Sequence, residues 1–138
     1  MISAIISTGL HAGGNEQDWT LTGFTKYRDA IFLHNKSTSY LLDNRVRAWI
    51  IIEPSVKSKY LREAQGELKK AGRPSKDLRY IEILNQIDCA GNQIHQEKIL
   101  YLNGNGGTIF FISHAVPKWK AIDRTNIWFG LLKKVCNK

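Results

Sequence analysis

Residues 79–114 of the chain read RYIEILNQIDCAGNQIHQEKILYLNGNGGTIFFISH. In the first eleven of these residues, apolar side chains stand two or four positions apart: they are Ile81, Ile83, Ile87 and Cys89. A period of two is typical of a strand that places one face against a core. We therefore expect a strand at residues 79–89 that carries Cys89 to the core face.

The rest of this stretch contains two turn-forming segments, residues 91–92 and the glycine-rich residues 103–107. The segments that follow them, residues 94–102 and 108–114, are rich in β-branched and aromatic side chains and predict two more strands. A phosphate-binding loop must lead into a helix, so the glycine-rich segment is interpreted as a hairpin turn. Three strands joined by short turns predict an antiparallel meander.

The N-terminal half continues the strand pattern. Residues 19–24 and 29–34 form short β-branched or aromatic runs, and residues 44–53 form the clearest strand of this half, which Pro54 ends. One face of that strand is apolar: it carries Val46, Ala48, Ile50 and Ile52. We expect this strand to lie in the same sheet.

Two segments have helical spacing instead. Residues 58–71 place apolar side chains three and four positions apart, followed by Gly72 and Pro74, which predicts a short amphipathic helix. Near the C-terminus, Asp123 or Thr125 can cap a second helix. Its apolar stripe is Ile127, Trp128, Leu131, Leu132 and Val135. The predicted fold class is α+β, an antiparallel meander packed against a C-terminal helix, with one short helix in mid-chain.

Length and composition indicate one globular domain. The chain has 138 residues, of which 43% are hydrophobic and only three are proline, so global disorder is excluded. No apolar run approaches the roughly 20 residues of a membrane-spanning helix, and we expect no transmembrane segment.

The first residues have the pattern of an export signal. Residues 2–10 are uncharged and rich in apolar side chains, and His11, Ala12 and two glycines follow. We interpret residues 1–14 as the remnant of a signal peptide and residues 15–138 as a single domain. The alternative is that residues 2–10 form a buried first strand.

The two cysteines each follow an apolar face, Cys89 at the end of a predicted strand and Cys136 after the stripe of the C-terminal helix. They are either two buried thiols or one bridge between sheet and helix. A bridge is favoured in an exported protein, because an oxidising compartment preserves it and it tethers the chain end. Their separation disfavours a metal site, and we expect neither a metal nor a cofactor.

The order of these features resembles the surface-adhesin protein E family of small exported bacterial proteins. The resembling elements are Trp19, the strand at residues 44–49, and the strand that ends in Asp88 and Cys89. They continue with Trp119 and Ile122, and with a closing helix that ends in residues 132–136, LKKVC. The similarity covers about residues 17–138.

This resemblance implies an antiparallel sheet with a flanking helix, a disulfide between Cys89 and Cys136, and export to the periplasm or cell surface. It also implies adhesion to extracellular-matrix glycoproteins such as laminin and vitronectin. The oligomeric state stays open, with a dimer among the alternatives.

Positive charge is concentrated in one segment. The chain carries 20 Lys and Arg against 12 Asp and Glu, a net charge of +8. Eight of these cations stand between residues 57 and 79: they are Lys57, Lys59, Arg62, Lys69, Lys70, Arg73, Lys76 and Arg79. Such a segment is either a solvated face or a surface for an anionic glycoprotein or another anionic glycan.

The candidate catalytic side chains lack the partner residues that catalysis requires. His95 and Glu97 are two positions apart in a predicted strand and could form an acid and base pair, but no nucleophile or metal-ligand cluster accompanies them. We therefore assign no catalytic residue and expect a non-enzymatic binding protein of the bacterial envelope. The alternative is an intracellular basic protein that binds nucleic acid non-specifically, which the absence of a base-reading motif disfavours.

Overall fold

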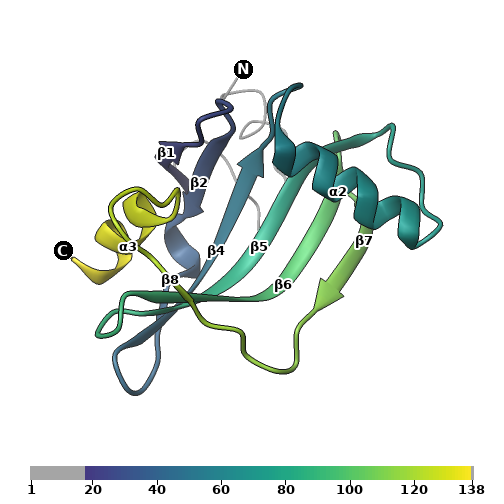
Figure 1. Ribbon diagram of the computed structural model, residues 1–138. Coiled ribbons are helices and arrows are strands. Elements are labelled where there is room, and N and C mark those ends of the chain that lie inside the picture. Colours follow the sequence, from purple (N-terminus) through teal and green to yellow (C-terminus); the bar gives the residue numbers. More distant parts are fainter. Residues whose placement is uncertain (1–17, 138) are drawn as a thin grey trace.

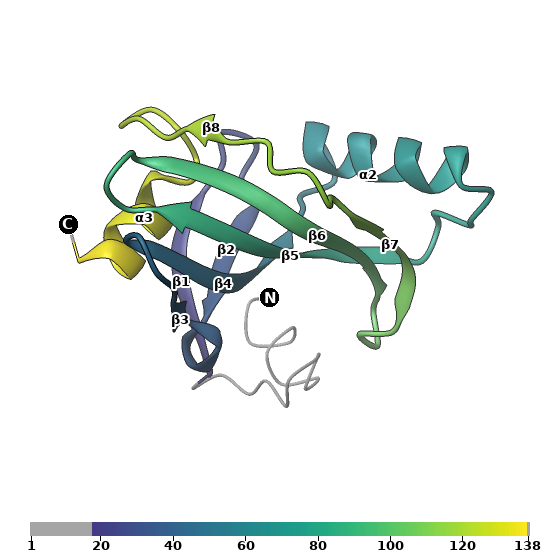
Figure 2. The same ribbon diagram turned by 90° about the horizontal axis from the view of Figure 1, so that it is seen from below.

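The computed structural model describes residues 18–137, so the expected signal remnant at residues 1–14 lies outside the described residues. These residues form one antiparallel sheet whose strands follow chain order along the path β1-β2-β4-β5-β6-β7. Two short strands lie off this path: β3 pairs with β4, and β8 pairs with β6 (Figures 1 and 2). The strands are β1 (Trp19–Phe24), β2 (Ala30–His34), β3 (Ser39–Tyr40), β4 (Arg45–Glu53), β5 (Leu78–Asp88), β6 (Gln93–Asn103), β7 (Thr108–Ser113) and β8 (Lys120–Ala121). The predicted meander is confirmed.

Helix α2 (Lys59–Lys70) connects β4 to β5, helix α3 (Phe129–Cys136) closes the chain, and a 3₁₀ turn, η2 (Asn35–Ser37), follows β2. Both α-helices pack on the same face of the curved sheet, α2 over the β5–β7 side and α3 over the β1–β2 side (Figures 1 and 2). The α+β class, the C-terminal helix and the mid-chain helix are therefore confirmed. No helix within residues 18–137 combines the length and the apolar character needed to cross a membrane.

The helix-covered face is built from isoleucines in register. One row crosses the sheet from Ile50 on β4 through Ile83 and Ile99 to Ile112 on β7. Ile50 and Ile83 are buried, whereas Ile99 and Ile112 are only partly buried. The period of two predicted for these strands therefore builds one continuous apolar layer, which thins toward the β7 edge.

The opposite face carries a second, smaller apolar cluster, formed by Trp19, Ala30, Phe32, Ile51, Tyr80 and Leu102. Phe32 pairs with Ile51 across β2 and β4, and both side chains are buried. β2 and β4 are thus buried on both faces, which explains why β4 contains the unbroken apolar run at residues 50–52.

Helix α2 is fixed at both ends by local hydrogen bonds. The Ser58 hydroxyl accepts from the backbone N–H groups of Tyr60 and Leu61, as an N-cap does. At the other end, Gly72 takes a positive φ of 69°, which a glycine adopts without steric cost. Ala64 and Leu68 are the buried residues of the helix. The predicted helix at residues 58–71 is confirmed to within one residue at each end.

The expected cap of the C-terminal helix is wrong. Helix α3 begins at Phe129, after Trp128, and not near Asp123 or Thr125. The Asp123 carboxylate instead accepts hydrogen bonds from the hydroxyl and the backbone N–H of Thr125, and these bonds lower the pKa of Asp123. The two residues form a separate turn, so Ile127 and Trp128 precede the helix, while Leu131, Leu132 and Val135 are buried as predicted.

Helix α3 docks against β1 at a glycine. A Cβ atom placed on Gly130 would lie 2.2 Å from the carbonyl oxygen of Thr22, which is a backbone atom and cannot rotate away. Only a residue without a side chain permits this approach. Gly130 therefore sets the distance between α3 and the sheet.

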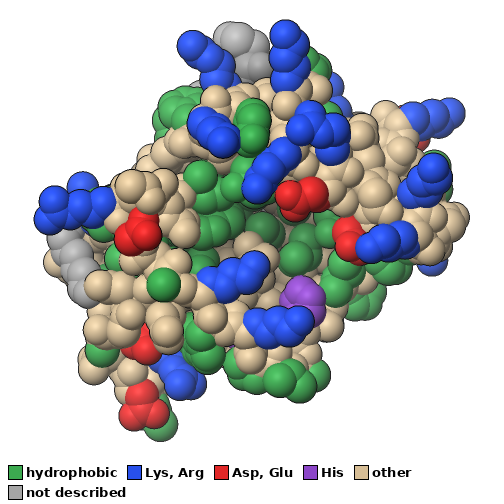
Figure 3. Space-filling model, in the orientation of Figure 1, with side chains coloured by type: hydrophobic (Ala, Val, Ile, Leu, Met, Phe, Trp, Pro, Cys, Tyr) green, Lys and Arg blue, Asp and Glu red, His purple; other side chains and the backbone are tan. Residues whose placement is uncertain are grey.

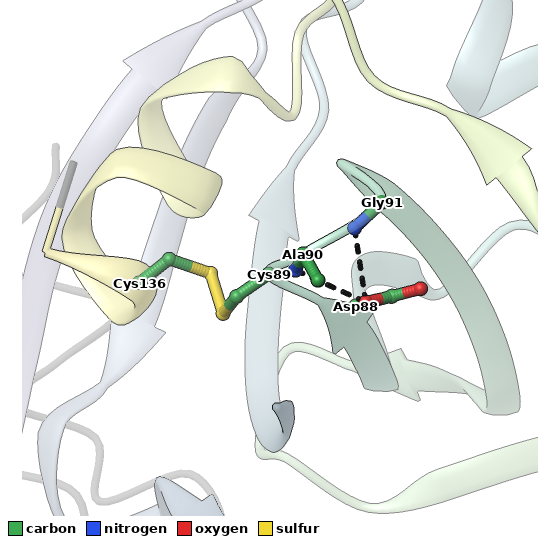
Figure 4. The surroundings of a disulfide bond; sticks show 5 residues. All are labelled: Asp88, Cys89, Ala90, Gly91 and Cys136. Carbon is green, nitrogen blue, oxygen red and sulfur yellow. Dashed lines mark hydrogen bonds between the residues drawn. A yellow bond between two sulfur atoms is a disulfide. The ribbon is translucent and has the colours of Figure 1, made fainter. Parts of the chain in front are cut away.

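A disulfide joins the end of β5 to the last residue of α3. The Cys89 and Cys136 Cα atoms are 5.6 Å apart, and the bond closes a loop across 47 positions (Figure 4). In the adjoining turn, the Asp88 carboxylate accepts from the N–H groups of Ala90 and Gly91. The sheet and the C-terminal helix are thus covalently linked, as the sequence led us to expect.

Gly130→Ala is expected to destabilise the protein by about 1–3 kcal/mol, because α3 must move away from Thr22 to make room for the methyl group. Urea unfolding followed by circular dichroism measures the change. Gly66→Ala is the matched control: no atom lies within 4 Å of a Cβ at that mid-helix position, so it should stabilise by about 0.5–1 kcal/mol. Equal stability of the two variants would contradict the close approach.

Replacing both cysteines by alanine is expected to cost about 4 kcal/mol of unfolding free energy, the loop-entropy value for a closed loop of 47 positions. Urea unfolding of the oxidised protein and of the Cys89→Ala/Cys136→Ala variant measures the difference. The oxidised protein treated with a reductant serves as the second arm and should match the variant. Identical midpoints for oxidised protein and variant would show that the bridge does not form in solution.

Candidate functional site

The basic segment of the sequence lies on and around α2. Lys59, Arg62, Lys69 and Lys70 belong to the helix itself, Lys57 precedes it, and the other three cations stand in the following loop and at the start of β5. All eight side chains are exposed. The structure therefore brings these residues to one region of the surface.

Helix α2 divides this charge between two sides. Lys59, Glu63, Glu67 and Lys70 follow one another at helical intervals and line a hollow between the helix and the sheet. There two carboxylates stand between two lysines, so the charges balance, and the Lys70 ammonium lies 3.7 Å from the Glu67 carboxylate. Arg62 and Lys69 belong to the side that does not line the hollow, where Arg62 donates to the Lys57 carbonyl oxygen. We call the outward set Arg62, Lys69, Arg73 and Lys76 the outer basic face.

The hollow beside α2 is a groove of about 680 Å³, continuous with two neighbouring hollows of about 710 and 220 Å³. Trp128 lines all three, so it stands where they meet. Figure 3 shows apolar side chains inside the hollow, with lysines, acidic side chains and a histidine around it. The volume of the main groove is within the range of small-ligand sites.

The floor of the main groove is the exposed end of the isoleucine layer. Ile83, Ile99 and Ile112 line it from three adjacent strands, and Ala64 lines it from α2. The floor is partly open toward the β7 edge of the sheet, where Ile99 and Ile112 are only partly buried. The groove thus combines an apolar base with charged walls.

The end of the groove away from α2 is positively charged. Lys118, Lys120, His95 and His114 line the 220 Å³ hollow, and no carboxylate is among its lining residues in the described part of the chain. The His114 ring stands beside the Gln96 carbonyl oxygen, 3.0 Å from its Nδ1 atom. This end has the character of an anion-binding pocket.

Two tyrosines in the groove have raised pKa values. Burial, together with the carboxylates of Glu67 and Glu63, raises the pKa of Tyr101 to about 12. Burial also raises the pKa of Tyr60, with contributions from Glu63 and Asp29. Both pKa shifts are caused first by burial, with smaller contributions from nearby carboxylates.

The structure places the candidate acid and base pair in structural roles. The Nδ1 atom of His95 accepts the backbone N–H of Lys118 at 3.1 Å. Glu97 binds the guanidinium of Arg47, at 2.9 Å and 3.0 Å, and accepts from the Gln86 amide. No cluster of three or more metal-binding side chains occurs in residues 18–137. In the glycine-rich loop, the Asn103 side chain accepts from the N–H groups of Asn105 and Gly107, which closes the hairpin between β6 and β7.

Sequence reasoning located the cations of α2 but missed the groove. Its floor residues gave the strand pattern of a core face, and nothing in that pattern says that Ile99 and Ile112 are left partly exposed. Lys118 and Lys120 stand in a segment without a helix or strand pattern. Only the tertiary structure places Ile99, Ile112, Lys118 and Lys120 beside one another.

No protein-family model matches the sequence, and no curated protein matches it. Solved structures match at the level of fold. The selenomethionine form of Haemophilus influenzae protein E has a TM-score of 0.58 at 9% identity, covering 89% of this chain and 88% of that one. A second structure of H. influenzae protein E has a TM-score of 0.56 at 8% identity, covering 88% and 86%. Protein E from non-typeable H. influenzae gives 0.55 at 8% identity, covering 88% and 77%.

At such low identity this likeness shows the fold alone. The chain has the fold of protein E, and the resemblance that the sequence suggested is confirmed at that level.

Tyr101 is expected to ionise last among the five tyrosines of the chain, at a pH near 12. Since its pKa in the folded state lies above the ordinary value of 10, its contribution to stability is present below pH 10 and is lost as the pH rises through about 12. A spectrophotometric titration of tyrosinate, with near-UV circular dichroism to monitor folding, measures this. Glu67→Gln should lower the pKa of Tyr101, and Tyr101→Phe should remove the last step. A last step that survives Tyr101→Phe would refute the assignment.

Proposed function

We propose that this chain is an exported, non-enzymatic binding protein of the bacterial cell envelope that attaches to anionic glycoproteins through the outer basic face of α2. The observation that carries this proposal is that the eight cations of the basic segment are all exposed and gathered around one helix. The four cations of the outer basic face form no ion pair with a carboxylate in residues 18–137. A sulfated or sialylated glycan presents the complementary charge.

Electrostatics of this kind act at the surface and depend on ionic strength. Each exposed charge pair contributes less than about 1 kcal/mol, so binding requires several cations that act together on a repeating anion. Arg62, Lys69, Arg73 and Lys76 supply such a set. Salt at physiological concentration screens charges beyond about 8 Å, so attachment should weaken steadily as salt is added.

Two observations support export. The disulfide between Cys89 and Cys136 is of a kind that persists in the periplasm and outside the cell and is rare in the reducing cytosol. The second is the sequence resemblance to the exported protein E family, whose fold this chain has. The same resemblance implies adhesion to matrix glycoproteins such as laminin and vitronectin. We therefore choose these two proteins, together with heparin, as the anionic partners to test.

Lys69→Glu/Arg73→Glu, which reverses two charges of the outer basic face, is expected to lower affinity for heparin by roughly tenfold or more, because two attractions become repulsions. The salt concentration needed for elution from a heparin column, and plate binding to laminin and vitronectin, measure the effect. Adding Lys76→Glu should lower both further.

The matched control is Lys133→Glu/Lys134→Glu. Lys133 and Lys134 stand in the last turn of α3, so the control has the same change in charge and, as Lys69→Glu does, places an acidic side chain near the C-terminus of a helix. It should elute at a higher salt concentration than the α2 variant. Equal retention of the two variants would show that net charge, and not the outer basic face, determines binding. Tighter binding to duplex DNA than to heparin at the same salt would favour the intracellular, nucleic-acid alternative.

A further inference from the structure

We infer that the groove between α2 and the sheet binds the single alkyl chain of an anionic amphiphile, with the acid head group at Lys118 and Lys120. This site is separate from the outer basic face, and its ligand is a small molecule instead of a glycoprotein.

The base of the groove suits an alkyl chain. The row formed by Ile83, Ile99 and Ile112 runs across three strands and offers apolar side chains. Covering this row removes apolar surface from water, which is favourable by about 25 cal/mol for each Å².

The charges around the groove favour one orientation of the alkyl chain. On the α2 side, the carboxylates of Glu63 and Glu67 stand between Lys59 and Lys70 and balance their charge. The pKa of Tyr101 is raised there by burial and by those two carboxylates. An anionic head group gains little there. At the other end, Lys118 and Lys120 form no ion pair with a carboxylate in residues 18–137.

The two ends belong to one continuous site. The main groove and the lysine-lined hollow share Gln96, His114, Lys120 and Trp128. A head group held by Lys118 and Lys120 can therefore be joined to a chain that lies on the isoleucine row. The His114 ring and the Trp128 indole stand at the junction, where the polar and apolar parts of the ligand would meet.

The shared ligand chemistry is one acidic group on one alkyl chain, which occurs in long-chain fatty acids and in lysophospholipids. The experiment uses cis-parinaric acid, a fluorescent long-chain carboxylate, with the folded, oxidised protein. Competition with decanoate, dodecanoate and tetradecanoate tests whether affinity depends on the length of the alkyl chain. Each added methylene should tighten binding up to about fourfold. Dodecan-1-ol has the chain without the charge, and lyso-phosphatidylglycerol carries a phosphate in place of the carboxylate.

Lys118→Gln/Lys120→Gln should weaken dodecanoate by about tenfold and leave dodecan-1-ol unchanged, because charge-assisted hydrogen bonds are lost while the floor is intact. Lys133→Gln/Lys134→Gln removes the same charge from α3, where neither lysine lines the groove, and should bind as the parent does. Ile112→Asp should weaken both ligands. Where that variant fails to fold, Ile112→Trp fills the groove instead and should have the same effect.

Retention on heparin should be the same for the parent and for Ile112→Trp, which separates this site from the outer basic face. Preference for lyso-phosphatidylglycerol over dodecanoate would identify a lipid head group as the source of the anion, and the reverse preference would identify a free fatty acid. Absence of saturable parinarate binding would overturn the inference. So would equal loss of dodecanoate binding in the two lysine variants, or binding only to phosphatidylglycerol vesicles.

Discussion

The isoleucine layer on one face of the sheet is the constraint on which the rest of this structure depends. Four isoleucines stand in register across four strands and form one apolar face: they are Ile50, Ile83, Ile99 and Ile112. This face is removed from water only where other elements of the chain cover it. The chain covers it with two helices. Helix α2 contributes Ala64 and Leu68, and helix α3 contributes Leu131, Leu132 and Val135.

Each helix is held in place by a different device, and their spacing follows from these devices. Ser58 fixes the start of α2 where β4 ends. Gly130 lets α3 approach Thr22, and the bond from Cys136 to Cys89 holds the far end of that helix to β5. Helix α3 is fixed near β1 and α2 lies over the β5–β7 side, and the layer stays partly exposed at Ile99 and Ile112. The groove beside α2 lies over that part of the layer.

Helix α2 thereby separates two kinds of surface. Its outward side carries cations such as Arg62 and Lys69, which suit a large anionic partner. Its inward side carries two lysines and two glutamates, whose charges balance, above an apolar floor, which suits a small ligand. The charge pattern on a single helix is therefore the reason that we assign two ligands of different size to one small protein.

The sequence by itself determined the six longer strands, both helices and the apolar face of β4, and it favoured the cysteine pair, because each rests on the period of side chains along a local segment or on the chemistry of two thiols. It also located the cations of α2. It did not show the two-residue strands β3 and β8. It did not determine the start of α3, where Asp123 and Thr125 bind each other in a separate turn. Only the tertiary structure decided that Ile99 and Ile112 stay partly open and that Lys118, Lys120 and Trp128 stand beside them. Periodicity shows which face of a strand is apolar, whereas the extent to which that face is covered depends on where distant elements dock.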